Sequence, residues 1–262
     1  MKAIILAAGI GKRLEKYTKG MPKCMLKFNG KTLIEWQIEA LRECGINEIL
    51  IVRGYMPDKI NMSGVKYYIN KDYANTNMVE TLFTAEEEMN DGVIVCYSDI
   101  LYQKSVIKKV ISSKADIGVT ADIDYLDYWK ARMDFPEKDM ESLVIKKGDI
   151  TELGETNCEI DKAKARYVGV IKFSKEGIRI LKKIYHQKKK KYYNKNESWL
   201  HSKSFKKAYM TSLLQAVINT GYKVKPIRIV KGWLEFDTEQ DYEKYNKWLK
   251  EETLKRFFEF DK

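Results

Sequence analysis

The sequence opens with an uninterrupted apolar segment that ends in a pair of glycines. Residues 3–8 carry no polar side chain, and Gly9, Gly11, Lys12 and Arg13 come soon after them. An apolar run without polar alternation is typical of a parallel strand that is buried on both faces. Glycines allow a tight turn and a close approach of the backbone to a ligand. The stretch therefore predicts a buried first strand whose carboxyl end cradles a polyphosphate with backbone N–H groups and fixed positive charge.

Two familiar phosphate-binding motifs do not fit this stretch. The dinucleotide fingerprint requires a third glycine where Leu14 stands and an acidic residue after the second strand, where Arg53 stands. The P-loop requires a glycine at Leu6 and a Ser or Thr at Arg13. Both motifs are excluded, so the glycine loop either binds phosphate in another way or is an ordinary turn after a strand.

Apolar patterns predict alternating strands and helices over the first 121 residues. Strands are expected over 48–52, 65–69, 92–97 and 115–121, and helices over 31–44, 78–89 and 106–111. Strands that alternate with helices at short intervals form right-handed βαβ units around a parallel sheet. The pattern therefore predicts the α/β fold class.

The rhythm changes after about residue 122. Strands at 143–145, 150–153 and 166–173 follow with few helices between them, which suggests a small antiparallel elaboration over about 122–205. The remaining segments predict helices over 175–186, 206–220 and 238–258, and strands over 223–230 and 233–237. We expect residues 1–262 to form a single domain with a core of about 1–121 and 206–262. Thr238 or Asp237 is expected to cap the last helix.

The charge of the chain indicates an anionic partner. Lys and Arg number 48 against 37 Asp and Glu, which gives a net charge of +11. Such a balance suits a nucleotide, a nucleic acid or a membrane surface. No run approaches the ~20 apolar residues of a membrane span, and the apolar start is too short for a signal peptide. Four dispersed cysteines are typical of a reducing compartment, so a cytoplasmic protein is expected, without a membrane partner.

Two aspartates follow predicted buried strands. Asp99 comes just after the strand at 92–97, and Asp237 ends the apolar segment that begins at Trp233. Ligands of open α/β sheets bind beyond the carboxyl ends of the strands. Mg²⁺ commonly takes one or two protein carboxylates and receives its other ligands from phosphates. Asp99 and Asp237 are therefore candidate ligands of one Mg²⁺ beside a phosphate chain, with helix capping as the alternative for each.

The string Leu-Ala-Ala-Gly-x-Gly-x-Arg-Leu at residues 6–14, with Pro22-Lys23 after it, resembles the start of the nucleotidyltransferase (sugar-nucleotide pyrophosphorylase) family. Further matching segments are 77–82, 97–99, 166–171, 209–211 and 233–238, and together they are most similar to the phosphocholine cytidylyltransferase-like branch. The resemblance implies a Rossmann-like three-layer α/β/α fold with a mixed, mostly parallel central sheet. It also implies Mg²⁺ and transfer of a nucleotidyl group to a phosphorylated acceptor, with release of pyrophosphate.

The resemblance assigns a nucleotide-binding half of the site residue by residue. The residues that it implies for nucleotide binding are Leu6, Ala8, Gly9, Gly11, Lys12, Arg13, Lys23, Asn77 and Ser98. The implied catalytic residues are Lys23, Arg13, Asp99 and Asp237, of which the two aspartates would hold the metal. Sugar-specific members usually carry a glycine within the stretch 75–81, which has none here. That departure favours CTP as the donor, by analogy.

The expected acceptor-binding residues lie in or beside the elaboration. They are Tyr128, Trp129, Arg132, Arg166 and Tyr167. Aromatic rings can cage a quaternary ammonium, and an arginine suits phosphate or carboxylate. The aromatic residues favour phosphocholine, and Arg132 favours a phosphorylated amino-acid amide, which carries its own carboxylate. The string Tyr-Trp-x-x-Arg at 128–132 also resembles the phosphoglutamine cytidylyltransferases. Packing in the core is an equally good interpretation of the aromatic residues.

Three other functions compete with a cytidylyltransferase. The first is a hexose-1-phosphate nucleotidylyltransferase, and the second is a nucleotide-binding protein without catalysis. The third is a nucleic-acid-binding protein, which the charge suggests but no known motif supports. We expect CTP and a phosphorylated small molecule as partners and no nucleic acid, and we leave a homodimer open.

Overall fold

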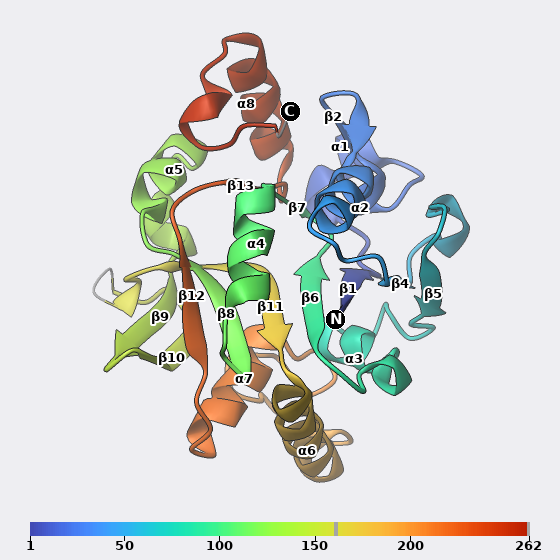
Figure 1. Ribbon diagram of the computed structural model, residues 1–262, viewed down its shortest axis with the longest axis vertical. Coiled ribbons are helices and arrows are strands. Elements are labelled where there is room, and N and C mark those ends of the chain that lie inside the picture. The colour runs from blue at the N-terminus through green and yellow to red at the C-terminus, as the bar shows by residue number, and fades with distance from the viewer. Residues whose placement is uncertain (160–161, 261–262) are drawn as a thin grey trace.

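A seven-stranded sheet forms the centre of the computed structural model, which describes residues 1–159 and 162–260 (Figure 1). The strand order is β12-β8-β11-β6-β1-β4-β5. These strands are β1 (Lys2–Ala7), β4 (Ile49–Arg53), β5 (Lys66–Ile69), β6 (Val93–Tyr97), β8 (Ile117–Asp122), β11 (Arg166–Phe173) and β12 (Lys225–Ile229). All of them except β11 run in the same direction. The mixed, mostly parallel sheet predicted from the sequence is therefore confirmed.

Strand β1 shows why the opening apolar run lies at the middle of the sheet. Ala3 and Ile5 contribute to the hydrophobic cluster on one face, and Ile4 and Leu6 contribute to the cluster on the other. A strand that is covered on both faces needs an apolar side chain at every position. Helices α2 (Leu33–Glu43) and α4 (Lys104–Ser112) cover the first face, whereas α3 (Met78–Phe83), α6 (Lys175–Tyr192) and α7 (Met210–Asn219) cover the second. The fold therefore has the three α/β/α layers that were expected.

Strand β11 lies in the central sheet, which corrects the expectation that it belongs to the elaboration. It pairs antiparallel with β6 on one side and with β8 on the other, and its arrow in Figure 1 points opposite to that of β6. Nearly all its side chains are buried, so its apolar sequence suits an inner position. What remains outside the sheet is helix α5 (Tyr125–Arg132) and an antiparallel hairpin of β9 (Glu141–Lys146) and β10 (Asp149–Thr156).

Two short antiparallel ladders lie outside the central sheet, one between distant segments and one within a tight hairpin. Strand β13 (Trp233–Glu235) pairs with β7 (Ile100–Tyr102), and β2 (Lys27–Phe28) pairs with β3 (Lys31–Thr32). Helix α1 (Glu15–Thr18) follows the glycine loop, and helix α8 (Glu239–Lys250) lies beside α5 at one end of the molecule (Figure 1). No helix in the described ranges is both long and apolar enough to cross a membrane.

Several helix ends differ from the sequence prediction. Helix α3 stops at Phe83 rather than at residue 89. Helix α8 stops at Lys250 rather than at residue 258, because the tail turns back and buries Phe257 and Phe258 in the core. Helix α6 continues to Tyr192 and thus includes the lysine run 188–191. Within that run Lys189 pairs with Glu80 at 2.8 Å. Thr238 caps α8, as predicted.

Candidate active site

The pairing of β13 with β7 brings Asp99 and Asp237 together beyond the carboxyl ends of β1 and β6. Asp99 stands directly before β7, and Asp237 stands two residues after the end of β13. The N–H of Phe236 donates to the Asp99 carbonyl at 2.8 Å, which extends the ladder by one bond. Two carboxylates from distant parts of the sequence therefore lie close together at the same edge of the sheet.

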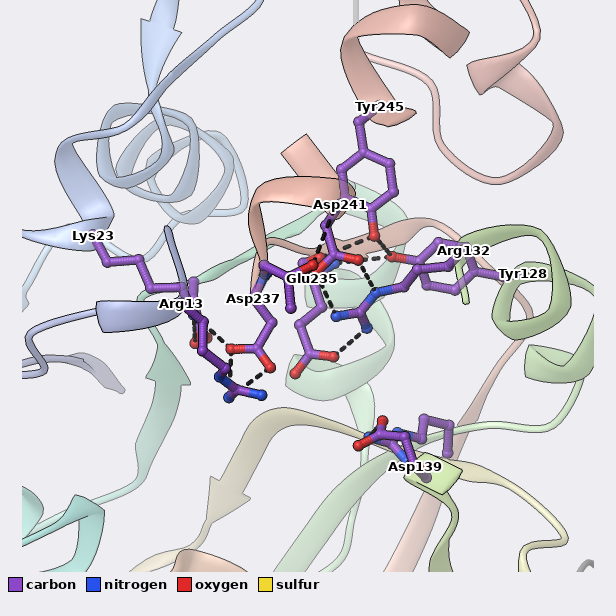
Figure 2. A network of polar contacts seen from close by, with 12 residues as sticks. Arg13, Lys23, Tyr128, Arg132, Asp139, Glu235, Asp237, Asp241 and Tyr245 are labelled. Atoms are coloured by element: carbon purple, nitrogen blue, oxygen red, sulfur yellow. Dashed lines mark hydrogen bonds and ion pairs between the residues drawn. The ribbon is translucent and has the colours of Figure 1, made fainter. Parts of the chain in front are cut away.

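Lys23 lies between these two carboxylates. Its Nζ donates to Oδ2 of Asp99 at 2.8 Å and to Oδ1 of Asp237 at 3.0 Å. Arg13 approaches Asp237 from the solvent side, with Nη2 at 2.8 Å from Oδ1 and 2.7 Å from Oδ2. Figure 2 shows Arg13 and Lys23 gathered on one side of Asp237. The four residues predicted to be catalytic thus form one connected cluster of charges.

Gly11 is needed for Lys23 to reach this position. Its backbone is in the left-handed region at φ 72°, which favours glycine. A Cβ at residue 11 would lie 2.8 Å from the Cβ of Lys23. Pro22 adopts an extended conformation before the 3-10 turn at Lys23–Met25, and this directs the lysine under the glycine loop. The glycine loop and the Pro-Lys pair, which are separate motifs in the sequence, therefore pack against each other in the structure.

The charges of this cluster influence one another strongly. Burial alone would lower the pKa of the Lys23 ammonium, but Asp99 and Asp237 outweigh it and leave that pKa raised. Burial raises the pKa of Asp237, and the nearby carboxylates of Glu235 and Asp99 add to this against the opposing effect of Lys23. Asp237 therefore protonates more readily than an ordinary aspartate, while Lys23 remains a cation.

The two aspartates fit a hard divalent cation. Oδ1 of Asp99 is buried and has no hydrogen-bond partner, so that oxygen has a lone pair available for a cation. Within residues 1–159 and 162–260 no group of three or more His, Cys, Asp or Glu side chains forms a metal site. Two carboxylates beside a phosphate-binding loop match the way in which Mg²⁺ is usually held, with phosphates and water as its other ligands.

A cleft extends from this cluster along the carboxyl end of β1. Its inner and outer parts are continuous, because Gly9, Lys23 and Asp99 line both. The predicted residues that line the inner part are Leu6, Ala8, Gly9, Lys23, Asn77, Ser98 and Asp99. Those that line the outer part are Gly9, Gly11, Lys12, Arg13, Lys23, Asp99 and Asp237. The structure therefore brings all the predicted nucleotide-binding residues to one continuous cleft with the charged cluster at its mouth.

Comparison with known proteins identifies the family. Residues 3–132 match the family described as the MobA-like NTP transferase domain. A CTP:phosphoglutamine cytidylyltransferase from Campylobacter jejuni is 36% identical over 254 residues, which are 93% of this chain and 98% of the relative. The chain belongs to the nucleotidyltransferase family.

Two solved structures show that this nucleotidyltransferase shares the fold of others. A CTP:phosphocholine cytidylyltransferase from Streptococcus pneumoniae matches with a TM-score of 0.68 and 23% identity, over 95% of this chain and 98% of that one. An inositol-1-phosphate CTP transferase from T. maritima matches with a TM-score of 0.70 and 20% identity, over 99% and 98%. At identities of 23% and 20%, the similarity to these two structures shows a shared fold only.

Several residues of the nucleotidyltransferase line the inner cleft without having been predicted. They are Ala7, Cys24, Tyr73, Thr76, Met78, Thr81 and Tyr97. Tyr73 reaches the cleft because residue 54 is a glycine, at which a Cβ would lie 2.7 Å from the Cβ of Tyr73. The sequence Arg53-Gly54 after the second strand was the available signal for this approach. Burial raises the pKa of Cys24 to about 12, so its thiol remains neutral and is a poor nucleophile.

Of the two interpretations of the aromatic residues, the structure supports packing in the core, and the acceptor-binding prediction for Tyr128 and Trp129 is wrong. Tyr128 and Trp129 are 1% and 0% exposed and belong to the hydrophobic core. The ring centroid of Trp233 lies 6.1 Å from that of Trp129 and 5.3 Å from that of Tyr128. Helix α5 is covered by β13 and by Tyr245 of α8, so its aromatic residues have no surface to offer an acceptor.

Arg132 is also not free to bind an acceptor. Its guanidinium is 3% exposed and binds Asp241 through Nε at 2.7 Å and Nη2 at 2.9 Å. A third nitrogen, Nη1, lies 2.5 Å from Oε2 of Glu235. Each of the three guanidinium nitrogens therefore already binds a protein carboxylate, and the side chain is buried, which corrects the acceptor-binding prediction for this residue.

Arg166 and Tyr167 occupy the start of β11, at the same edge of the sheet as Asp99. Arg166 donates to the carbonyl oxygen of Asp139 at 2.7 Å and to its Oδ2 at 3.1 Å. The Tyr167 hydroxyl donates to the hydroxyl of Tyr97 at 2.9 Å, and Tyr97 lines the inner cleft. These two residues lie at the edge of the sheet where the cleft opens, and Tyr167 contacts a residue that lines it, so both remain candidates.

Proposed function

We propose that the protein is a Mg²⁺-dependent cytidylyltransferase that transfers CMP from CTP to a phosphorylated small molecule and releases pyrophosphate. The observation that supports this most is the position of Lys23, held between Asp99 and Asp237 at the mouth of the cleft. A cation and two carboxylates beside a glycine loop suit the α-phosphate of a nucleotide and its metal. CTP is favoured because the relative that spans nearly the whole chain is named for it.

The proposed reaction is an in-line substitution at the α-phosphorus of CTP. An oxygen of the acceptor phosphate forms a bond to that phosphorus, and the bond from the phosphorus to the oxygen bridging to the β-phosphate breaks. The electron pair of the broken bond leaves with pyrophosphate. An acceptor phosphate is already ionised near neutral pH, so no residue has to remove a proton from it. Positioning and charge stabilisation then provide most of the acceleration.

The chain's own cations have to offset the repulsion between two anionic reactants. Lys23 is suited to the α-phosphate, because the pKa of its ammonium is raised, which keeps it charged, and because Asp99 holds it in place. Arg13 and the exposed Lys12 line the outer cleft, where the β- and γ-phosphates would lie. Mg²⁺ held by Asp99 and Asp237 would neutralise phosphate charge as a Lewis acid. Removal of any one of these charges should therefore slow the reaction more than it weakens folding.

We propose phosphoglutamine as the acceptor, with phosphocholine as the second candidate. The relative that spans nearly the whole chain is named for phosphoglutamine. The loss of the aromatic cage removes the main argument for phosphocholine, since Trp129 is fully buried. Arg166 and Tyr167 at the start of β11 are the remaining candidates for contact with the acceptor.

An acceptor panel tests the proposal. The protein is incubated with CTP and Mg²⁺ and with phosphoglutamine, phosphocholine, phosphoethanolamine or a hexose 1-phosphate, and pyrophosphate release is measured. We expect the highest kcat/KM with phosphoglutamine, no turnover after EDTA treatment, and recovery when Mg²⁺ is restored. Parallel reactions with UTP, dTTP, ATP and GTP measure the choice of base. Turnover only with a hexose 1-phosphate would instead establish the competing sugar-nucleotide function.

A further inference from the structure

Arg132 lies at the centre of a buried network that connects helix α5 to the segment carrying Asp237. Its guanidinium makes a forked contact with Asp241 and a separate contact with Glu235. Arg132 and Asp241 are each 3% exposed. Figure 2 shows this network on the opposite side of Asp237 from Arg13 and Lys23.

Asp241 links the arginine to the backbone of Asp237. Its Oδ2 accepts hydrogen bonds from the N–H of Asp237 at 3.0 Å and from the N–H of Thr238 at 2.8 Å. The same Oδ2 receives Nη2 of Arg132. One carboxylate oxygen thus joins the guanidinium to the peptide that carries the candidate catalytic aspartate.

Two tyrosines fix the strand that precedes Asp237. The hydroxyl of Tyr128 accepts from the N–H of Glu235 at 3.0 Å, and the hydroxyl of Tyr245 donates to the Glu235 carbonyl at 2.9 Å. The two hydroxyls also lie 2.5 Å apart. Both backbone groups of Glu235 are therefore held, and its carboxylate is held by Arg132.

We propose that Arg132 is a positioning residue for nucleotidyl transfer, which through Asp241 and Glu235 sets the backbone and the charge environment of Asp237. The inference rests on the proposed function, in which Asp237 acts at the metal and the phosphates. A lysine could supply the charge at residue 132, but its N–H groups share one nitrogen and lack the planar fork of three nitrogens with which the guanidinium holds both carboxylates at once. Without the fork, Asp241 would release the Asp237 peptide and Glu235 could turn toward Lys23.

Arg132→Lys is the principal test variant, measured with CTP, Mg²⁺ and the best acceptor of the panel. We expect kcat to fall by about 10- to 100-fold, as is typical when a partner that orients a metal ligand is lost. The Mg²⁺ concentration for half-maximal rate should rise. Binding of Mn²⁺ in the presence of CTP, followed by electron paramagnetic resonance, should weaken as well, and this readout does not depend on turnover.

Lys244→Met is the matched control. Lys244 also connects the end of α5 to α8, because its Nζ donates to the carbonyl of Arg132 at 2.7 Å and to Oδ1 of Asp134 at 3.0 Å. It does not contact Asp241 or Glu235 in the described structure. This variant should retain kcat and Mn²⁺ binding within about twofold, which separates loss of the positioning contacts from a general loosening of α5 against α8.

A double variant decides whether Arg132 acts through Asp237. In the Asp237→Asn background, Arg132→Lys should lower the remaining rate by less than about twofold, since the group that it positions is already lost. An equal factor in both backgrounds, or a wild-type rate for Arg132→Lys alone, would overturn the inference. If Arg132→Lys does not fold, Asp241→Asn is compared in the same way, with circular dichroism as the check on folding. A wild-type rate for Asp237→Asn would instead contradict the proposed function.

Discussion

Gly11 and Lys23 are packed so closely that a Cβ on residue 11 would lie 2.8 Å from the Cβ of Lys23. The glycine loop therefore packs directly on the side chain of Lys23, and this side chain extends past the loop to reach Asp99 and Asp237. This relationship gives the first prediction.

Gly11→Ala should impair catalysis more than stability. The left-handed conformation at φ 72° costs a non-glycine residue about 1–2 kcal/mol, and the added methyl group must also displace Lys23. We expect kcat to fall by about 10- to 100-fold, because a small displacement of a positioned group has effects of this size. Gly148→Ala is the control, since that glycine has φ 82° but a methyl group added there would meet no other side chain or backbone within 4 Å. It should lose similar stability in urea unfolding and keep its activity.

Lys23→Met should reduce kcat by at least about 10²- to 10³-fold, the usual effect of removing a group that stabilises transition-state charge. The protein should remain folded by circular dichroism, because the lysine is one of several groups in a partly exposed cluster. Asp99→Asn should produce a loss of comparable size. Lys31→Met, which removes a lysine paired with Glu39 away from the cleft, serves as the control. Near-normal pyrophosphate release by Lys23→Met or Asp99→Asn would contradict the assigned roles.

Trp129→Ala should destabilise the protein by about 3–5 kcal/mol, the typical cost of deleting a large buried aromatic side chain. The reason is that Trp129 is fully buried against Trp233 and Tyr128. Urea unfolding measures the loss. The more conservative Trp129→Phe should leave the KM for the acceptor unchanged. If Trp129→Phe raised the acceptor KM and left stability unchanged, Trp129 would bind the acceptor instead of filling the core.

The Glu235 carboxyl should make stability depend on pH in a defined range. Burial alone would raise its pKa, but Arg132 and Arg166 lower the pKa of Glu235 to about 2. A carboxyl whose folded pKa is depressed stabilises the protein above its unfolded pKa of about 4.5, and this contribution is lost as pH falls toward 2. Urea unfolding of wild type and Glu235→Gln from pH 7 to pH 2.5 measures it. The difference should be largest near pH 7 and shrink steadily below pH 4.5. A difference that does not vary with pH would refute this assignment.

The nucleotide cleft could be predicted from the sequence because its signals are local. An apolar strand followed by a glycine loop, and a strand that ends in Asp99, are each encoded within a few residues. The predicted residues at these positions line one cleft. The identity of Thr238 as a helix cap was similarly local, and the Asp241 that completes its capping box could have been found three residues later.

The acceptor side could not be predicted in the same way, because it depends on contacts between distant segments. Whether Trp129 lines a pocket or fills the core is decided by β13 and α8, which cover it. Arg132 looked available because its partner Asp241 belongs to a helix more than a hundred positions later. Strand order has no local signal either, so the place of β11 between β6 and β8 became apparent only from the structure.

The reversed direction of β11 has a consequence for how such an enzyme can change. Strand β8 ends and β11 begins at the same edge of the sheet, with Asp122 paired to Arg166. The segment that connects them leaves the sheet at this edge, and it contacts the rest of the fold through the buried face of α5 and through the bond from the N–H of Ile150 to the carbonyl of Val224. Exchanges at the exposed positions of this segment can therefore accumulate over evolution without shifting the register of any central strand, provided that Arg132 and the buried aromatic residues of α5 are kept. A lineage can thus acquire a new acceptor by rewriting the exposed part of one excursion of the chain, while the contacts that hold the Asp237 segment are inherited.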